Sequence, residues 1–159
     1  MSTIAAGILA LLVAQTAEGE ALENLVPGGL YDHGLLRPPS KGATPDAFDD
    51  GGRVLISIVV PDRGEEIDLG GPSDASLDIQ AITAFPEVWF YGPTTSTGKD
   101  AVRALYNLVF GILNGAVIVG LGGSCVGLRA SGRKGIADDP ELSGAVSDRM
   151  RLQADGFWA

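Results

Sequence analysis

Few residues of this chain belong to the types that catalyse reactions. The single histidine, His33, follows Asp32, and a carboxylate beside an imidazole is a pair used in general acid–base catalysis. The single cysteine, Cys125, follows Ser124, and either side chain becomes a nucleophile when a base activates it. Neither pair has a third partner at a recognisable spacing, and a histidine in a turn-like YDHG is typical of a surface residue. The sequence therefore favours a protein that builds a surface over an enzyme.

A glycine-lysine pair in GPTTSTGKD suggests a phosphate-binding loop. The nucleotide motif has four residues between its first glycine and the Gly-Lys pair, and then a Ser or Thr that holds magnesium. Here five residues separate Gly92 from Gly98, and Asp100 replaces the hydroxyl and would face the phosphates. We therefore interpret the turn as the start of a helix, with Thr97 capping it and Asp100 reaching back in a capping box.

Paired carboxylates occur at 49–50, 65–66 and 138–139. No stretch has the alternating ligands and closing glutamate of a calcium loop, and no ligand set suits zinc. Adjacent acids in glycine-rich loops are typical of a solvated surface. We expect no metal and no other cofactor.

The charge of the chain is acidic and unevenly distributed. A net charge of -9 and a pI near 4.4 oppose nucleic-acid binding as the main role, because that binding depends on lysine and arginine. Residues 44–78 contain nine Asp or Glu against two Arg, a local balance of -7. This segment is either a set of solvated loops or a surface that faces a basic partner or keeps a polyanion from sticking.

The clearest structural signal lies in residues 85–115. FPEVWFYGP predicts an aromatic strand, in which Pro86 implies an edge or a bulge because proline cannot donate to a ladder. An amphipathic helix follows and ends at Gly115. Phe110 falls beside the polar stripe of this helix, where either a loop or a subunit contact would cover it. The apolar face comprises Val102, Leu105, Tyr106, Val109, Ile112 and Leu113.

Residues 4–14 (IAAGILALLVA) contain no polar side chain. Their 11 residues fall short of the ~20 that span a bilayer, and a signal peptide would need basic residues before them, whereas the first basic residue is Arg37. We expect a helix capped by Ser2 or Thr3 and buried on all sides, either by its own core or by a neighbouring subunit.

The remaining pattern predicts one α+β domain over residues 1–159, with a single mixed or antiparallel sheet, one long packed helix and an N-terminal helix. A short helical turn is expected within 18–29, and an extended segment from Leu30. Strands are expected at 54–60 (buried on both faces), 77–81, 85–91 and 149–157, with a hairpin of 116–121 and 125–130. Large charged loops are expected at 35–53, 62–74 and 132–148.

Taken in order, these elements resemble the tail terminator proteins of long-tailed (siphovirus-like) bacteriophages. The order is an N-terminal helix of ALLVAQ type, an extended LYDHGLLRPP, a buried strand, a strand ending VWFYGP, the helix GKDAVRALYNLVFGIL, and a C-terminal strand after an arginine-rich loop that contains DDP. The resemblance spans nearly the whole chain and rests on this order and on short runs such as VWFYGP.

This resemblance implies a structural protein of the virion neck. Proteins of that family form a hexameric ring on the last ring of the tail tube, stop its growth and offer a face to the neck. The expected partners are further copies of the chain, the tail tube protein and head connector or adaptor proteins, with DNA passing through without specific binding and with no membrane contact. Assembly is expected in the bacterial host cytoplasm. The alternatives are another head–tail neck protein, or a small cytosolic ligand-binding domain or enzyme.

Candidate interface residues follow from charge and exposure rather than from a motif. The basic cluster Arg129, Arg133 and Lys134 would meet the acidic 44–78 region of the next subunit in a head-to-tail ring, or would pair within one subunit. The candidate interface residues are Phe110, Arg129, Arg133, Lys134, Asp49, Asp50, Glu65 and Glu66.

Overall fold

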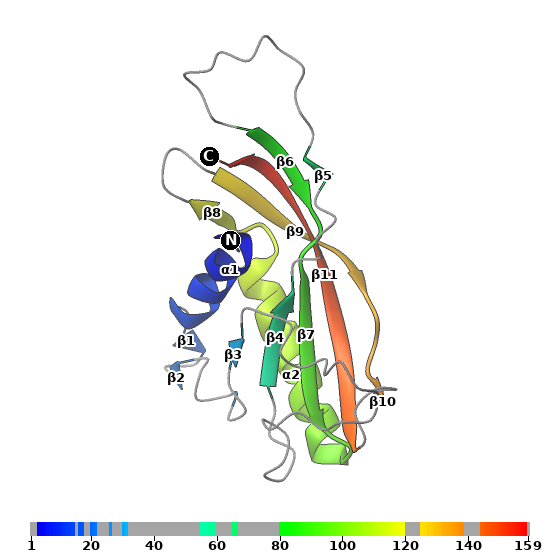
Figure 1. Ribbon diagram of the computed structural model, residues 1–159. Coiled ribbons are helices and arrows are strands. Elements are labelled where there is room, and N and C mark those ends of the chain that lie inside the picture. The colour runs from blue at the N-terminus through cyan, green and yellow to red at the C-terminus, as the bar shows by residue number, and fades with distance from the viewer. Residues whose placement is uncertain are drawn as a thin grey trace.

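The protein has an α+β fold in which two helices lie against one face of a largely antiparallel sheet (Figure 1). The computed structural model describes residues 3–14, 16–17, 20–21, 26, 30–31, 55–59, 65–66, 80–119, 125–138 and 144–158. The two helices and the largely antiparallel sheet confirm the α+β fold class predicted from the sequence. The elements are α1 (Thr3–Ala14), β1 (Thr16–Ala17), β2 (Glu20–Ala21), β3 (Leu30–Tyr31), β4 (Leu55–Val59), β5 (Glu65–Glu66), β6 (Gln80–Ala84), β7 (Glu87–Pro93), α2 (Ser96–Leu113), β8 (Val117–Val119), β9 (Cys125–Arg133), β10 (Ala137–Asp138) and β11 (Ala145–Trp158).

Strand β11 is the centre of the sheet. The strand order is β3-β4-β7-β11-β6-β5, in which β7 and β6 pair with consecutive parts of one edge of β11. Strands β9 and β10 pair with the opposite edge of β11, and β8 pairs with β9. Every described pair in this sheet is antiparallel except β3 with β4. The antiparallel pairing of β8 with β9 confirms the predicted hairpin.

The predicted strand 149–157 is confirmed, but the prediction of a charged loop at 132–148 was wrong at both ends. Strand β9 continues to Arg133, β10 occupies 137–138, and β11 already begins at Ala145. The loop prediction failed because Ser147 and Asp148, which are polar, are fully buried in the sheet.

Pro86 lies inside the sheet rather than at an edge. Strands β6 and β7 pair with β11 in one register, with Ala84 opposite Ala154 and Glu87 opposite Arg151. The Leu152 amide donates to the Pro86 carbonyl over 2.9 Å, so the missing proline donor breaks the strand without shifting its register. The bulge lies across β11 instead, on β9, where the register shifts between Arg151 and Leu152.

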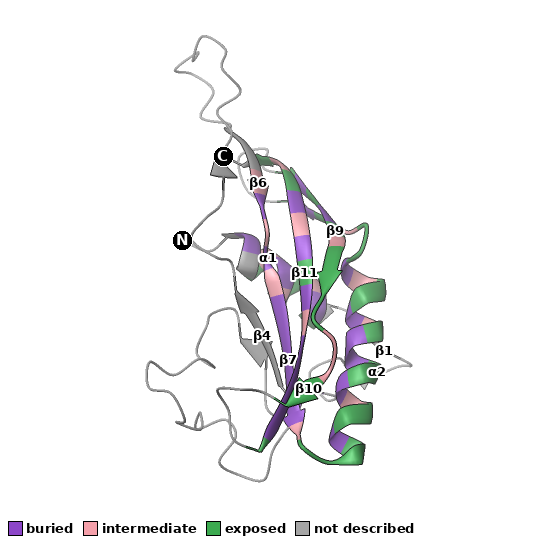
Figure 2. Cartoon of the chain, turned by 90° about the vertical axis from the view of Figure 1, so that its right-hand side faces the viewer, coloured by how far each residue is buried: buried purple, intermediate pink, exposed green. Residues whose placement is uncertain are grey.

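The helix-facing side of the sheet carries the core. Residues directly opposite each other in antiparallel strands share a face, so Phe90 and Val88 of β7 lie on the same side as their partners Asp148 and Met150. The phenyl ring of Phe90 lies 5.5 Å from the Tyr106 ring of α2. Figure 2 shows the resulting pattern, with β7 and much of β11 buried, β9 and β10 largely exposed, and α2 buried on one side and exposed on the other. The buried positions of α2 are Gly98, Val102, Leu105, Tyr106, Val109 and Leu113, as the sequence predicts for its apolar face, with Ile112 half-buried.

The N-cap of α2 lies two residues earlier in the chain than predicted. Thr95, in extended conformation, accepts a hydrogen bond from the Gly98 amide over 3.0 Å and is the N-cap. Thr97 lies inside the first turn, and Asp100 pairs with Arg103 at 3.0 Å rather than reaching back. The predicted capping box at Thr97 was therefore wrong, while Gly115 follows the helix end with a positive φ of 87° as expected.

Helix α1 is present as predicted but is not buried on all sides. It packs against α2, β4 and β8, and among its positions with described burial the buried ones form the stripe Ile4, Ile8 and Leu12. Ala6, Ala10 and Val13 are exposed, because the helix lies at the margin of the helical layer. Neither described helix combines the length and hydropathy that a membrane span requires.

A short strand pair replaces part of the predicted helical turn at 18–29. Strands β1 and β2 pair antiparallel, with Ala17 opposite Glu20. The glycine between them in sequence, Gly19, disfavours a helix and favours a turn. The predicted strand at 54–60 appears as β4 and the extended segment as β3, whereas Glu65–Glu66, predicted as part of a loop, form β5. Residues 77–79, the predicted loop 35–53 and the rest of 62–74 lie outside the described part.

Candidate interaction surface

A buried carboxylate organises the polar residues next to β11. Asp148 lies on the helix-facing side of the sheet with no exposed surface. Its Oδ2 accepts from Arg133 Nε at 3.0 Å and from Nη2 at 2.7 Å, and its Oδ1 accepts from the amides of Gly135 and Arg149. Because both oxygens are hydrogen-bonded and the charge is paired, this burial is tolerated in the core.

Arg133 also contacts the long helix. Its guanidinium carbon lies 3.9 Å from the centroid of the Tyr106 ring, a cation–π contact that links β9 to α2. Burial raises the pKa of the Tyr106 hydroxyl, against the opposing charge of Arg133 and with a smaller contribution from Asp148. The helix, β9 and β11 are thereby joined at one point.

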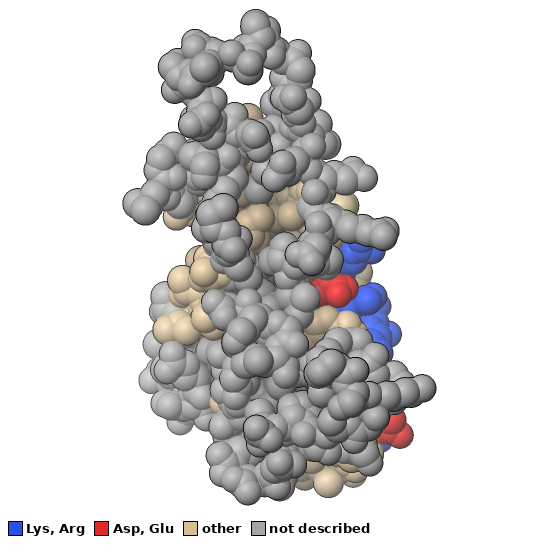
Figure 3. All heavy atoms as spheres, in the orientation of Figure 1, with Lys and Arg blue, Asp and Glu red and all other residues tan. Residues whose placement is uncertain are grey.

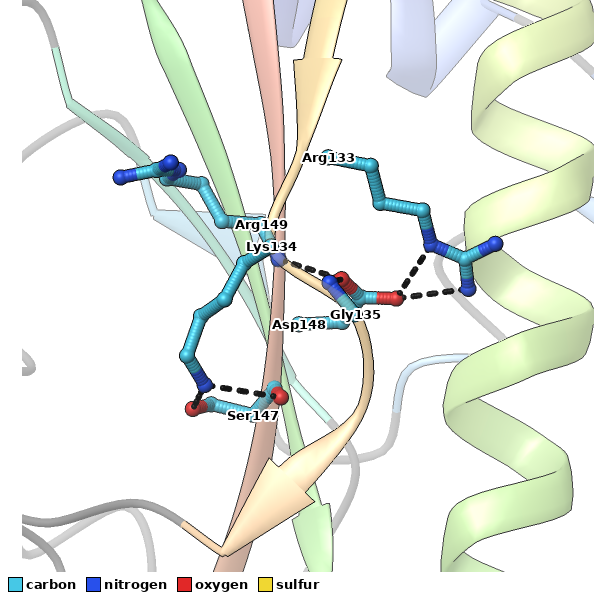
Figure 4. A network of polar contacts seen from close by, with 6 residues as sticks. All are labelled: Arg133, Lys134, Gly135, Ser147, Asp148 and Arg149. Carbon is cyan, nitrogen blue, oxygen red and sulfur yellow. Dashed lines mark hydrogen bonds and ion pairs between the residues drawn. The ribbon is translucent and has the colours of Figure 1, made fainter.

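Lys134 points to the opposite face of the sheet from Arg133, as Figure 4 shows. Its Nζ donates to the hydroxyl and to the carbonyl oxygen of Ser147, at 2.8 and 3.2 Å. The ammonium also lies 6.0 Å from the Trp89 ring centroid, and the Arg149 guanidinium lies 5.7 Å from the same centroid. Arg149 pairs with Glu87 at 3.5 Å.

The predicted basic cluster therefore divides into two kinds of residue. Arg133 and Lys134 are held by Asp148 and Ser147 of the same chain, which agrees with the alternative that this cluster pairs internally, although the acid is Asp148 and not part of 44–78. Arg129 instead bonds to the neutral amide of Gln153, at 2.8 Å, and stays exposed. Charge reversal at Arg133 or Lys134 would thus disturb the fold before it tested assembly.

The sheet face turned away from the helices is buried at one end and open at the other. Near the start of β11, Trp89 and Tyr91 are 8% and 1% exposed. Toward the end of β11, Phe157 is 50% and Val119 is 77% exposed. We call this second region the open face, and it comprises Val117, Val119, Cys125, Arg129, Arg151 and Phe157.

Register places these six residues on one surface. Cys125 lies opposite both Val119 of β8 and Phe157 of β11, so the three form a row across the sheet. Ile118, between the two exposed valines, points the other way and is buried against α1. Val117, Arg129 and Arg151 lie on further rows of the same surface. In Figure 3 the described basic side chains that are visible gather along one side of the molecule.

The other candidate interface residues are dispersed. Phe110, 40% exposed, projects from the outer side of α2, on the opposite side of the sheet from the open face. Glu65 and Glu66 form β5, which pairs with β6 at the edge of the sheet. Asp49 and Asp50 lie outside the described residues.

The residues considered for catalysis are not brought together in the described structure. His33, Asp32 and Ser124 lie outside the described residues, and Cys125 is exposed beside apolar neighbours on the open face. Within the described ranges, no group of three or more His, Cys, Asp or Glu side chains is close enough to hold a metal ion.

No known protein-family model and no curated protein matches this sequence. The surface is therefore interpreted from its own geometry. Sequence reasoning missed Asp148, Arg149, Arg151 and Phe157. Arg151 alternates with the apolar Met150 and Leu152 in the sequence, but only the pairing of β9 with both β8 and β11 reveals which exposed residues adjoin it.

Proposed function

We propose that this chain is a structural protein of the phage neck, a tail terminator that forms a ring on the end of the tail tube, stops its polymerisation and joins the tail to the head connector. The order of sequence elements that resembles this family motivates the proposal. The observation that carries it is that opposite charges belong to different segments of the chain: exposed arginines lie on β9 and β11, whereas nine acids lie in residues 44–78.

A chain that carries basic and acidic residues on different segments suits head-to-tail contacts between identical copies, and such contacts close into rings when the rotation permits. The exposed Phe110 on the helix layer supplies a second surface, on the opposite side of the sheet, for a further copy or for the tail tube. An acidic chain also suits a channel through which DNA passes without binding.

The decisive experiment is the mass of the purified protein in solution, with and without tail tube protein, followed by electron microscopy of the mixture. A ring, and tubes that stop growing with a ring at one end, are the expected results. A chain that stays monomeric at high concentration and leaves tube growth unchanged would contradict the proposal.

Another neck protein, such as a head-completion or adaptor protein, is the second candidate, since these also form rings from small domains. It predicts a ring that binds the head connector and does not cap tubes. Adding connector and tube protein in separate experiments distinguishes the two candidates.

A further inference from the structure

The open face combines exposed apolar side chains with exposed arginines. Val119 and Phe157 flank Cys125 in one row, and all three are exposed. Large apolar side chains grouped at the edge of a sheet mark an interaction site more often than single exposed ones do. Strand β8, whose described pairing is only with β9, borders this patch.

The two arginines of the open face keep their charge available. Arg129 donates to Gln153, whose amide nitrogen donates to Asp155 at 2.9 Å, and Thr83 donates to the other oxygen of Asp155 at 2.8 Å. These contacts hold the Arg129 side chain along the surface. Among the described residues, its guanidinium bonds to a neutral amide and to no carboxylate.

Arg151 lies over the Phe85 ring, 4.8 Å from its centroid. The ion pairs recorded among the described residues involve Arg103, Arg133 and Arg149, but neither Arg129 nor Arg151. Two acids adjoin them on this face: Glu87 pairs with Arg149, whereas the exposed Asp155 accepts only from neutral donors, so the two arginines exceed the unpaired acid by one charge. Two guanidinium groups beside an apolar patch are suited to an acidic chain segment that also carries apolar side chains.

We propose that the open face is the docking surface for the acidic residues on either side of β4, within residues 44–78, of a second copy of this chain; β4 itself stays paired in its own sheet. The inference rests on the proposed ring-forming function and names the surface and the segment that would meet. The segment carries the complementary charge, -7, and interleaves its acids with apolar residues such as Ile67 and Leu69. The contact joins two different surfaces, so it is head-to-tail, as a closed ring requires.

The chain contains its own reporter for this contact, because Cys125 is the only cysteine and lies within the open face. The experiment measures the rate at which the wild-type thiol reacts with a small alkylating reagent, at protein concentrations below and above assembly. Docking is expected to slow the reaction at least about tenfold in the assembled state, because thiol reactivity depends on access. No substitution is involved, so misfolding cannot cause the result.

Charge reversal supplies the second arm. Arg129→Glu and Arg151→Glu are each expected to raise the concentration for half-assembly about tenfold at low salt, and the matched control Lys99→Glu, an exposed cation on α2, less than about twofold. The difference should shrink as salt screens the charges. Thermal melts of the three variants verify that each is folded.

The outcomes separate this inference from the proposed function. A wild-type protein that assembles while Cys125 reacts as fast as in the monomer overturns the docking surface and leaves the ring intact. Arginine variants that assemble like Lys99→Glu also overturn it. A wild-type protein that never assembles, even with tube protein, overturns the proposed function itself.

Discussion

The carboxylate of Asp148 is held by the guanidinium of Arg133 through two hydrogen bonds of 3.0 and 2.7 Å, although Asp148 lies fully buried on the core side of β11. The pair links neighbouring strands, and the same guanidinium covers the Tyr106 ring of α2. One ion pair thereby positions the end of β9 relative to both the sheet and the helix.

Removal of the arginine is expected to leave a buried carboxylate with only two backbone donors. We predict that Arg133→Met lowers the free energy of unfolding by about 2–4 kcal/mol, because breaking a buried pair leaves the remaining charge without a partner. The half-exposed position of Arg133 makes the lower half of this range the expected one. The control Arg103→Met breaks the exposed pair with Asp100 and should cost less than about 1 kcal/mol. Urea denaturation measures both, and equal losses would contradict the prediction.

Tyr106 should make the protein less stable in alkali. Burial, opposed by Arg133 and assisted by Asp148, raises the pKa of its hydroxyl above the ordinary 10.0. Below about pH 10 the folded and unfolded states both keep the proton, so this group adds no pH dependence. Above it the unfolded chain loses the proton first, and stability falls as pH rises.

The Tyr106→Phe variant lacks this loss. The difference in unfolding free energy, wild type minus variant, is therefore expected to decrease between pH 9 and 11. Guanidinium titrations of both proteins at several pH values measure it. Two parallel curves would show that Tyr106 ionises alike in both states.

The cap of α2 provides a test between two neighbouring threonines. Thr95 accepts from the Gly98 amide, whereas Thr97 is an exposed residue of the first turn. We predict that Thr95→Ala costs about 1 kcal/mol of stability and that Thr97→Ala costs less than about 0.5 kcal/mol. Denaturation midpoints of the two variants make the comparison, and a larger loss at Thr97 would restore the cap predicted from sequence.

The elements that sequence predicted best are those in which burial follows a simple period. The apolar face of α2 repeats every three to four residues, and Met150, Leu152 and Ala154 alternate on β11, so both were located from the pattern alone. Aromatic residues of β7 likewise identified a buried strand.

Two of the failures share a physical origin, namely side chains whose surroundings are set by partners distant in the sequence. Asp148 resembles a loop residue in sequence, and only Arg133, fifteen positions away, makes its burial tolerable. The open face was missed for the same reason, since Val119, Cys125 and Phe157 become neighbours only when three strands pair. The charge cluster was located, but its division between internal and exposed arginines depends on side-chain contacts that no spacing encodes.

Two glycines of α2 should respond oppositely to the same substitution. A Cβ at Gly98 would overlap the carbonyl oxygen and ring of Pro93, so the close approach of the first turn to the end of β7 requires glycine. A Cβ at Gly111 would meet nothing within 4 Å. We therefore predict that Gly98→Ala destabilises the protein by about 1–3 kcal/mol through strain against the backbone. Gly111→Ala should instead stabilise it by about 0.5–1 kcal/mol, because alanine loses less conformational freedom in a helix. Chemical denaturation of the two variants measures the signs, and a stabilising Gly98→Ala would show that α2 does not pack against Pro93 in solution.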